Sequence, residues 1–202
     1  MARKSSADME KTKQVLLEEG VALLQERGYH ATGIQEIATS ANIPKGSFYN
    51  YFASKEEFAA AVIRHYAQTS LCSWQESLNQ AAAQYETGEV LYQTFLAATE
   101  KYRCSEQKKG CLLGTLAAEI SEASEECRQA LQTSIANFIK VLAEHLARGQ
   151  ASGAVRREME PQLLATLVWD MWQGSLLRMK VEKSVAPVQA DLDVLFHQLL
   201  RP

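Results

Sequence analysis

Apolar residues recur at helical spacing along almost the whole chain. Leu17, Val21 and Leu24 stand at i, i+4 and i+7 in the first such segment, which extends from about Asp8 to Arg27. Gly28 follows in the position that most often ends a helix. Further periodic segments predict helices over residues 54–78, 87–103, 124–148 and 161–182, and from residue 187 onward. The chain is therefore predicted to be all-α.

The last two of these helices are apolar on more than one side. A helix with apolar residues around more than half of its circumference must be covered twice. We expect these helices to cover the core with one side and a second copy of the chain with the other, in a four-helix interface. The alternative is a monomer with a larger core. The side chains predicted to form the interface are Leu164, Val168, Met171, Leu192, Leu195, Phe196 and Leu199.

The segment TGIQEIATSANIPKGSFYNYFASKE, from Thr32 to Glu56, predicts two short helices joined by a tight turn. Thr32 is the expected N-cap of the first, and Gln35 three residues later completes a capping box. Asn42 lies in the turn, where it tolerates the left-handed backbone that such a corner needs. The second helix is predicted from Pro44 to about Tyr51, because proline suits a first helical turn.

The second helix is short and polar. Its eight residues include a glycine, so it would be a poor core element. Small, hydroxylated, amide and cationic side chains suit a DNA major groove. The alternative is an ordinary helical hairpin with half-buried tyrosines. Ser54, with Glu57 three residues on, forms a second capping box and starts the next helix.

The run T-x4-IA-x2-A-x-I-x-KGSFYNYF-x-SKE resembles the DNA-binding domain of TetR-family transcriptional regulators. The resemblance covers roughly residues 8–66, with Asn42 where the family usually has glycine. It implies a helix-turn-helix domain over residues 1–53, running into the following helix to about 66. A helical bundle for effector binding and dimerisation would occupy residues 54–202. It also implies a homodimer on double-stranded, two-fold symmetric operator DNA, and repression rather than activation.

The family motif, matched residue by residue, also implies which side chains contact DNA. The phosphate contacts that it implies are Thr32, Lys45, Tyr49, Tyr51 and Lys55. Gly46 would let the duplex approach closely, and Ser47 and Asn50 are the candidates for contacts to base edges. Phe48 and Phe52 would point inward as hydrophobic anchors.

Composition and charge narrow the functional class. The chain has 47% apolar and 22% charged residues, which is ordinary for a globular protein. No apolar run is long enough to span a membrane, and the N-terminus lacks a secretory signal, so we expect a cytosolic protein. Residues 1–55 hold seven Lys/Arg and six Asp/Glu, whereas the remainder holds 14 and 18. The more acidic remainder is not expected to touch nucleic acid.

Chemistry-bearing residues show no catalytic or metal-binding arrangement. The histidines are scattered at positions 30, 65, 145 and 197, with no Ser/His/Asp set and no Gly-rich phosphate loop. The cysteines, at positions 72, 104, 111 and 127, match no zinc spacing and are not expected to form disulfides in the cytosol. We therefore expect neither an enzyme nor a cofactor. A purely structural helical adaptor would have no use for the polar second helix.

Cys111 is the candidate for effector sensing. It follows Lys108-Lys109-Gly110 and begins an apolar helix, and both cations and a helix N-terminus favour the thiolate. The segments GCL (110–112) and WQGSLLRMK (172–180) resemble the TetR subgroup of N-ethylmaleimide reductase repressors, which senses electrophiles and oxidants. That resemblance implies that Cys111 is the sensor thiol and that Lys180 faces it. Two alternatives stay open: an inert, packed Cys111, or a small apolar effector bound reversibly among Trp74, Tyr92, Phe95, Trp169 and Trp172.

Overall fold

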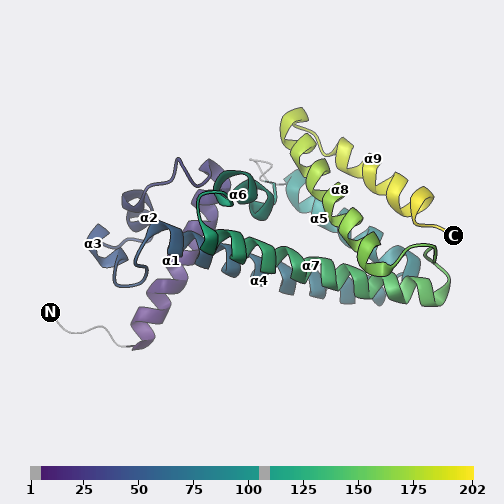
Figure 1. The fold of residues 1–202 in the computed structure, drawn as a ribbon, viewed down its shortest axis with the longest axis horizontal. Helices are drawn as coiled ribbons and strands as arrows, with labels where there is room; N and C mark the ends of the chain where they lie inside the picture. The colour runs from purple at the N-terminus through teal and green to yellow at the C-terminus, as the bar shows by residue number, and fades with distance from the viewer. Residues whose placement is uncertain (1–5, 105–109) are drawn as a thin grey trace. The chain divides into compact units, whose positions relative to one another are not determined.

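The computed structural model describes residues 6–104 and 110–202, and every regular element in this part of the chain is helical (Figure 1). The all-α prediction is therefore confirmed. The elements are α1 (Ser6–Arg27), α2 (Ile34–Ser40), α3 (Lys45–Phe48), α4 (Lys55–Ala82), α5 (Thr87–Cys104), α6 (Leu112–Ile120), α7 (Glu125–Ser152), α8 (Pro161–Glu182), α9 (Ala186–Val194) and the π-helical turn η1 (Leu195–Leu199). No helix in the described part of the chain is long and apolar enough to cross a membrane.

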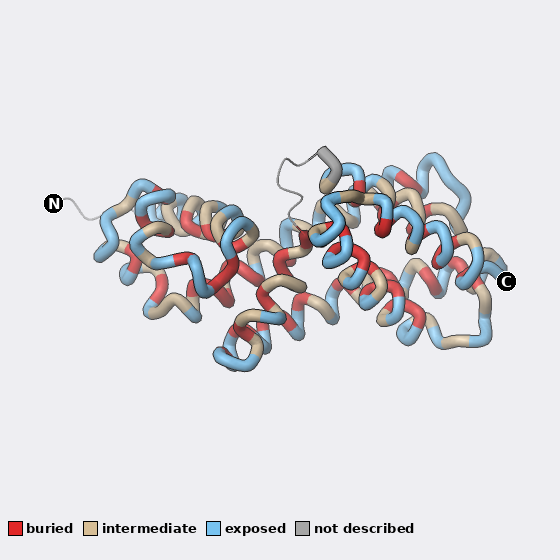
Figure 2. The backbone as a smooth tube through the Cα atoms, turned by 90° about the horizontal axis from the view of Figure 1, so that it is seen from above, coloured by how far each residue is buried: buried red, intermediate tan, exposed pale blue. Residues whose placement is uncertain are grey.

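The backbone forms two compact units. One comprises the residues up to Gln68 together with Leu112–Ser134, and the other comprises Thr69–Cys111 and Ile135–Pro202. Buried positions, red in Figure 2, occur in both units. The first unit thus joins α6 and the start of α7 to the predicted helix-turn-helix. The division into residues 1–53 and 54–202 stays a prediction.

The first unit is built on a close contact between α1 and α4. A Cβ added at Gly20 of α1 would lie 2.5 Å from the ring of Phe58 and 2.7 Å from Val62. The buried side of α1 is consequently Leu16, Gly20 and Leu24, one residue away from the predicted Leu17 and Val21, which are half-buried. The helical periodicity selected Leu17 and Val21 because their side chains are large and apolar. However, α1 and α4 approach most closely at Gly20, which has no side chain.

The predicted start of α4 is confirmed in detail. The hydroxyl of Ser54 accepts a hydrogen bond from the amide of Glu57 at 3.0 Å. The carboxylate of Glu57 in turn accepts one from the amide of Ala53 at 2.7 Å. Ser54 thus satisfies a backbone donor of the first turn, and Glu57 satisfies the donor of the residue that precedes Ser54. It fixes the point at which the chain leaves the helix-turn-helix.

In the second unit, the ends of α7 and α8 are set by left-handed residues. Helix α7 continues beyond the predicted residue 148 to Ser152, because Val155 packs over the buried Gly149, and Gly153 with φ +79° then ends the helix. Helix α8 starts at Pro161 as predicted and ends before Lys183, whose φ is 54°. Helix α9 lies alongside α8 and passes into the π-helical turn η1 (Figure 1).

Candidate nucleic-acid interface and sensor region

The corner between α2 and α3 is a Schellman motif. The amide of Asn42 donates to the carbonyl of Thr39 at 3.0 Å, and the amide of Ile43 donates to that of Ala38 at 2.9 Å. Asn42 has φ 53°, so the predicted left-handed turn is confirmed. Glycine meets this backbone requirement at no steric cost, and asparagine is the residue that approaches it most nearly.

The effect of a substitution at Asn42 on stability is expected to depend on how well the new residue tolerates positive φ. Asn42→Ala should lower the free energy of unfolding by about 1 kcal/mol, because an ordinary side chain is strained at positive φ. Asn42→Gly should leave stability unchanged or raise it by up to about 1 kcal/mol. Urea unfolding of the two variants and the wild type measures both. Equal stability of the alanine and glycine variants would contradict a left-handed corner.

Helix α3 is shorter than predicted. Pro44 is its N-cap, with extended backbone at φ −60° and ψ 142°, and the helix ends at Phe48 rather than near Tyr51. The chain then turns more tightly, because the amides of Asn50 and Tyr51 donate to carbonyls three residues back, at 3.2 and 2.9 Å. The predicted range of 44–51 was therefore too long.

The inward side of this segment is confirmed as an aromatic anchor. Phe48 and Phe52 are buried and meet Phe58 of α4, with ring centroids 5.4 and 5.1 Å apart in edge-to-face arrangements. The centroids of Phe48 and Phe52 are 5.7 Å apart. Such pairs stabilise beyond the area that they bury. The three rings together hold α3 and the following turn against α4.

The outward side gathers most of the predicted DNA-contacting residues. Lys45, Gly46, Tyr49 and Asn50 are exposed, with Tyr49 52% accessible. Ser47 and Tyr51 are half-buried in the same segment. A Cβ added at Gly46 would meet nothing within 4 Å, so the packing of this chain does not require glycine there. The empty space around Gly46 would allow the predicted close approach of a DNA duplex.

The predicted role of Thr32 is wrong. The N-cap of α2 is Gly33, and no side chain caps this helix. Thr32 is 0% exposed, and its hydroxyl donates to the carbonyl of Gly28 at 2.7 Å. A side chain without accessible surface cannot reach a phosphate. Thr32 instead closes the turn between α1 and α2.

Lys55 occupies the predicted first turn of α4, but it is already engaged. Its ammonium donates to the carbonyl of Tyr29 at 2.7 Å and lies 4.1 Å from the centroid of the Tyr29 ring. Partial burial lowers the pKa of Lys55. The side chain thus ties α4 to the end of α1, and a phosphate contact by Lys55 stays a prediction.

Glu119 of α6 also stabilises the turn that follows α1, and the sequence analysis did not identify it. Its carboxylate accepts hydrogen bonds from the amides of Tyr29 and His30, at 2.6 and 3.3 Å. Gly28 has φ +79°, where other residues are strained, and a Cβ there would also press on the carboxylate of Glu119. The hydroxyl of Tyr29 donates to Glu56 at 3.0 Å, and burial followed by this bond raises the pKa of Tyr29. Side chains from α4 and α6 thus converge on the turn that follows α1.

In the second unit, the side chain of Lys180 lies next to the residue that precedes Cys111. Cys111 is half-buried and directly precedes α6, close to the predicted helix start. A Cβ added at the adjacent Gly110 would lie 3.0 Å from Cε and 3.6 Å from Nζ of Lys180. The lysine side chain thus packs on the residue before the thiol. Lys108 and Lys109, the predicted cationic neighbours, lie outside the described residues.

Two other cysteines differ from Cys111 in environment. Cys127 is fully buried, and its thiol donates to the carbonyl of Glu56 at 3.4 Å. Burial raises the pKa of Cys127, which disfavours the reactive thiolate. Cys72 is exposed. The side chain of Cys104 lies outside the described part of the structure. Where side chains are described, no group of three or more His, Cys, Asp or Glu could hold a metal ion.

The aromatic residues considered for reversible effector binding pack largely on one another. The ring centroids of Trp74 and Phe95 are 4.8 Å apart, and those of Phe95 and Trp172 are 4.9 Å apart. Trp169 stacks on Phe138 at 5.2 Å. Each of these contacts fills space that a ligand would need. The arrangement favours a core role for this cluster.

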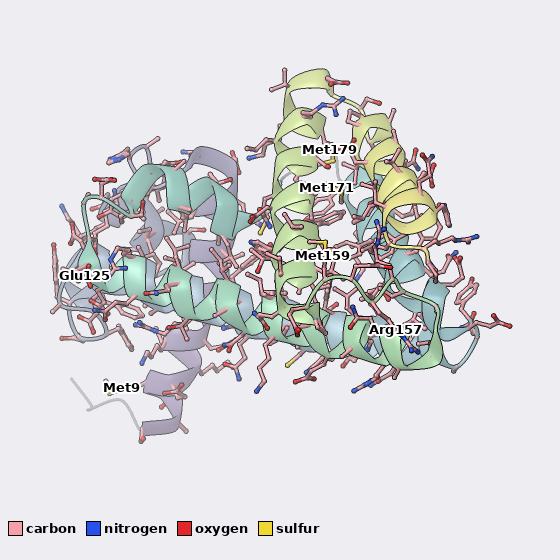
Figure 3. The ribbon with its side chains drawn as sticks, turned by 45° about the vertical axis from the view of Figure 1, so that its right-hand side comes forward. Met9, Glu125, Arg157, Met159, Met171 and Met179 are labelled. Atoms are coloured by element: carbon pink, nitrogen blue, oxygen red, sulfur yellow. The ribbon has the colours of Figure 1, made fainter. Side chains whose placement is uncertain are left out.

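The predicted subunit interface needs a correction. Leu164, Val168, Leu192, Leu195 and Phe196 are buried within the single chain, so their side chains belong to its core. Met171 is half-buried, whereas Met179, on the same helix in Figure 3, is fully buried. Leu199 is 54% exposed, and its role in the subunit interface stays a prediction.

A different side of α8 is apolar and uncovered. Its exposed residues, which we call the α8 stripe, are Leu163, Leu167, Leu177 and Val181. At about 100° per residue, these positions fall within roughly 80° of one another around the helix. Val194 of α9 is also exposed. Uncovered apolar side chains in one row are typical of an interaction surface.

Two family models match the chain. The model described as bacterial regulatory proteins, tetR family, matches residues 16–62. The model described as a tetracyclin repressor-like C-terminal domain matches residues 89–194. The first match contains α2, α3 and their corner, and the second contains Cys111, Lys180 and the α8 stripe.

Relatives of known name match over most of their length. The HTH-type transcriptional repressor DhaR of Mycobacterium sp. (strain GP1) is 34% identical over 93% of this chain and 92% of its own. The HTH-type transcriptional repressor NemR of Escherichia coli (strain K12) is 31% identical over 88% of each chain. The crystal structure of reduced E. coli NemR superposes with a TM-score of 0.82 and 27% identity, covering 90% of this chain and 93% of that one.

Proposed function

This chain belongs to the TetR family of bacterial regulatory proteins and is a DNA-binding transcriptional regulator rather than an enzyme, and from that premise we propose a more specific function. It acts as a homodimeric repressor that binds a palindromic operator and leaves it when an electrophile or oxidant modifies Cys111. The observation that carries the sensing half is the packing of Lys180 against Gly110, directly before the thiol.

The DNA-binding half rests on the exposed segment 45–50. In this proposal Lys45 and Tyr49 contact phosphates, and Asn50 and Ser47 contact base edges. Their exposure supports these roles, because Lys45, Tyr49 and Asn50 are exposed and Ser47 is half-buried. The aromatic anchor behind this segment fixes its position, so little order has to be gained on binding. TetR-family repressors bind DNA and typically act as dimers with small-molecule effectors. Two copies of the segment would contact two half-sites.

Lys45→Ala is expected to weaken binding to every DNA sequence. Loss of one phosphate contact should cost about 1–3 kcal/mol and reduce the slope of log affinity against log salt by about 1. Fluorescence anisotropy at several salt concentrations measures both, on operator and on unrelated DNA. Lys140→Ala, an exposed lysine of α7, is the matched control and should change neither value. Wild-type affinity and salt slope in Lys45→Ala would refute this docking.

The sensing half is supported by the environment of Cys111. The thiol is half-buried, so reagents can reach it, and a cationic side chain packs beside its neighbour. A nearby cation stabilises the thiolate, which is the nucleophile. By contrast, Cys127 is buried with a raised pKa. The solved relative NemR is described in a reduced form, which agrees with redox chemistry in that protein.

Cys111→Ser is expected to bind operator like the wild type and to lose its response to electrophiles and hypochlorite. Treatment of the wild type should lower operator affinity by at least about tenfold, a typical allosteric coupling. Gel mobility shift before and after treatment, with mass spectrometry of the modified peptide, measures the response. Cys72→Ser is the control and should respond as the wild type does. Release of treated Cys111→Ser from operator would show that another group is the sensor.

A further inference from the structure

The α8 stripe is arranged symmetrically about one residue. Leu163 and Val181 each stand nine residues from Trp172 in the sequence. Leu167 and Leu177 each stand five residues from it. An isologous interface requires such a pattern, because a two-fold axis sets the same surface of two subunits face to face. If two copies of α8 pack antiparallel with this axis beside Trp172, Leu163 lies opposite the partner's Val181. Leu167 then lies opposite the partner's Leu177.

The middle of the α8 stripe holds two residues that are not large and apolar. Asp170 and Gly174 are exposed, and each stands two residues from Trp172. At about 100° per residue, both fall inside the roughly 80° that the stripe spans around the helix. The same axis therefore sets Asp170 opposite the partner's Gly174, twice in the dimer. A carboxylate thus lies at the centre of the surface that the partner would cover.

Gly174 provides room for this carboxylate. A Cβ added at Gly174 would meet nothing within 4 Å, so the packing of the single chain does not require glycine there. Glycine in the interior of an exposed helix lowers stability relative to alanine. A partner side chain that lies directly against the helix backbone would explain why glycine is present. The open space at Gly174 and the position of Asp170 complement each other in this way.

A cation for the carboxylate stands one helical turn beyond Gly174. Arg178 is about 40° from Gly174 around α8 and about 6 Å further along the axis, a distance that an arginine side chain spans. Its side chain is 57% exposed and pairs with Glu182 at 3.3 Å and Asp191 at 3.6 Å. Exposed pairs of this kind contribute little to stability, so Arg178 can turn to another carboxylate. In the described part of the chain, no residue forms an ion pair with Asp170.

We propose that, in the dimer, the carboxylate of Asp170 lies against the partner's Gly174 and pairs with the partner's Arg178. Two such pairs flank the two-fold axis, and the apolar residues of the α8 stripe lie on either side of them. The occupant of this surface is thus a second copy of the chain, which charge complementarity selects. A related chain without these charges would leave Asp170 unpaired. The proposal rests on the homodimer of the proposed function.

The same contacts select one register of the two helices. Sliding one copy of α8 by seven residues, in either direction, would set Asp170 opposite the partner's Leu167 or the partner's Val181. Both alternatives cover a charge with an apolar side chain and leave it unpaired, which is unfavourable. A polar residue at one position of a helical interface fixes register and partner in this manner, at some cost in stability.

The test uses charge reversal in the full-length protein. Asp170→Lys would face the partner's Arg178, and Arg178→Glu would face the partner's Asp170, so each homodimer carries two repulsive pairs. The heterodimer of these two variants regains two attractive pairs. By sedimentation velocity, we expect the dissociation constant of each homodimer to rise at least about tenfold and that of the heterodimer to be within about threefold of the wild type. Native mass spectrometry identifies the heterodimer, because its subunits differ in mass.

Two further variants serve as control and as independent test. Lys140 is an exposed lysine of α7 outside the α8 stripe, so Lys140→Glu should stay dimeric and should not restore pairing to Asp170→Lys. Gly174→Leu would fill the space for the carboxylate and should raise the dissociation constant at least about tenfold. Its urea midpoint, measured where the protein is monomeric, should not fall, because leucine favours a helix more than glycine does.

The outcomes separate this inference from the proposed function. Charge-reversed variants that each form a homodimer of wild-type stability overturn the inference, as does a mixture without preference for the heterodimer. If Leu167→Glu with Val181→Glu abolishes the dimer while both charge reversals leave it intact, the homodimer stands and the inference fails. If the heterodimer forms as expected but the wild type binds no DNA site more tightly than unrelated DNA, the proposed function fails and the inference stands.

Discussion

A variant with Leu167→Glu and Val181→Glu is expected to be a folded monomer with operator affinity at least about a hundredfold below the wild type. Both side chains are exposed in the single chain, at 49% and 82%, so the substitutions should not disturb its core. In a dimer that buries the α8 stripe, each glutamate would place an unpaired charge in an apolar interface. A monomer also loses the gain from linking two half-site contacts, which is about 10²–10⁴-fold.

Sedimentation velocity and fluorescence anisotropy measure these two effects. Tyr85→Glu places the same charge on another exposed apolar residue, in the loop after α4, and should leave a dimer with normal affinity. Leu164→Glu, in the neighbouring buried position, should unfold the protein instead. A dimer of wild-type stability in the double variant would show that α8 pairs through another surface or not at all.

Phe48→Ala is expected to lower the free energy of unfolding by about 3–5 kcal/mol, as for other buried aromatic residues. The ring is 0% exposed and contacts the rings of Phe52 and Phe58. Its loss removes the central member of the anchor that holds the exposed segment 45–50. Operator affinity should therefore fall as well, although Phe48 itself cannot touch DNA.

Urea unfolding and operator titration should be read together for Phe48→Ala and Tyr49→Ala. Tyr49 is exposed, so its replacement should change stability by no more than about 0.5 kcal/mol while operator affinity still falls. The two variants thus distinguish a residue that supports the DNA-contacting segment from a residue that contacts DNA itself. A Phe48→Ala protein with wild-type stability and affinity would refute the anchoring role.

The corner between α2 and α3 was predicted well from the sequence, because its conformation depends on residues that are close together in the chain. The left-handed Asn42, the cap at Ser54 and the inward Phe48 all follow from residues within four positions of one another. The prediction that Thr32 caps α2 was wrong because the neighbouring Gly33 is the N-cap. The hydroxyl of Thr32 donates a hydrogen bond to the carbonyl of Gly28 instead. Sequence alone does not rank two such neighbours.

Periodicity identified a doubly apolar α8 but assigned its two sides wrongly. Leu163 and Leu164 are equally apolar neighbours, yet one is exposed and the other is buried. A pattern shows that two sides exist and cannot say which one meets the core. Glu119 was missed for a different reason. It meets Tyr29 across 90 positions of sequence, and no local signal marks such a contact.

The most direct test of the central claim compares a complete operator with half of one. The operator is first located by footprinting on DNA upstream of the gene and is then titrated by fluorescence anisotropy, intact and with one half-site scrambled. Analytical ultracentrifugation gives the number of protomers bound. The account predicts a bound dimer on the intact site and binding at least about a hundredfold weaker to the half-site. Binding of one protomer to the half-site with the affinity of the intact operator would contradict it.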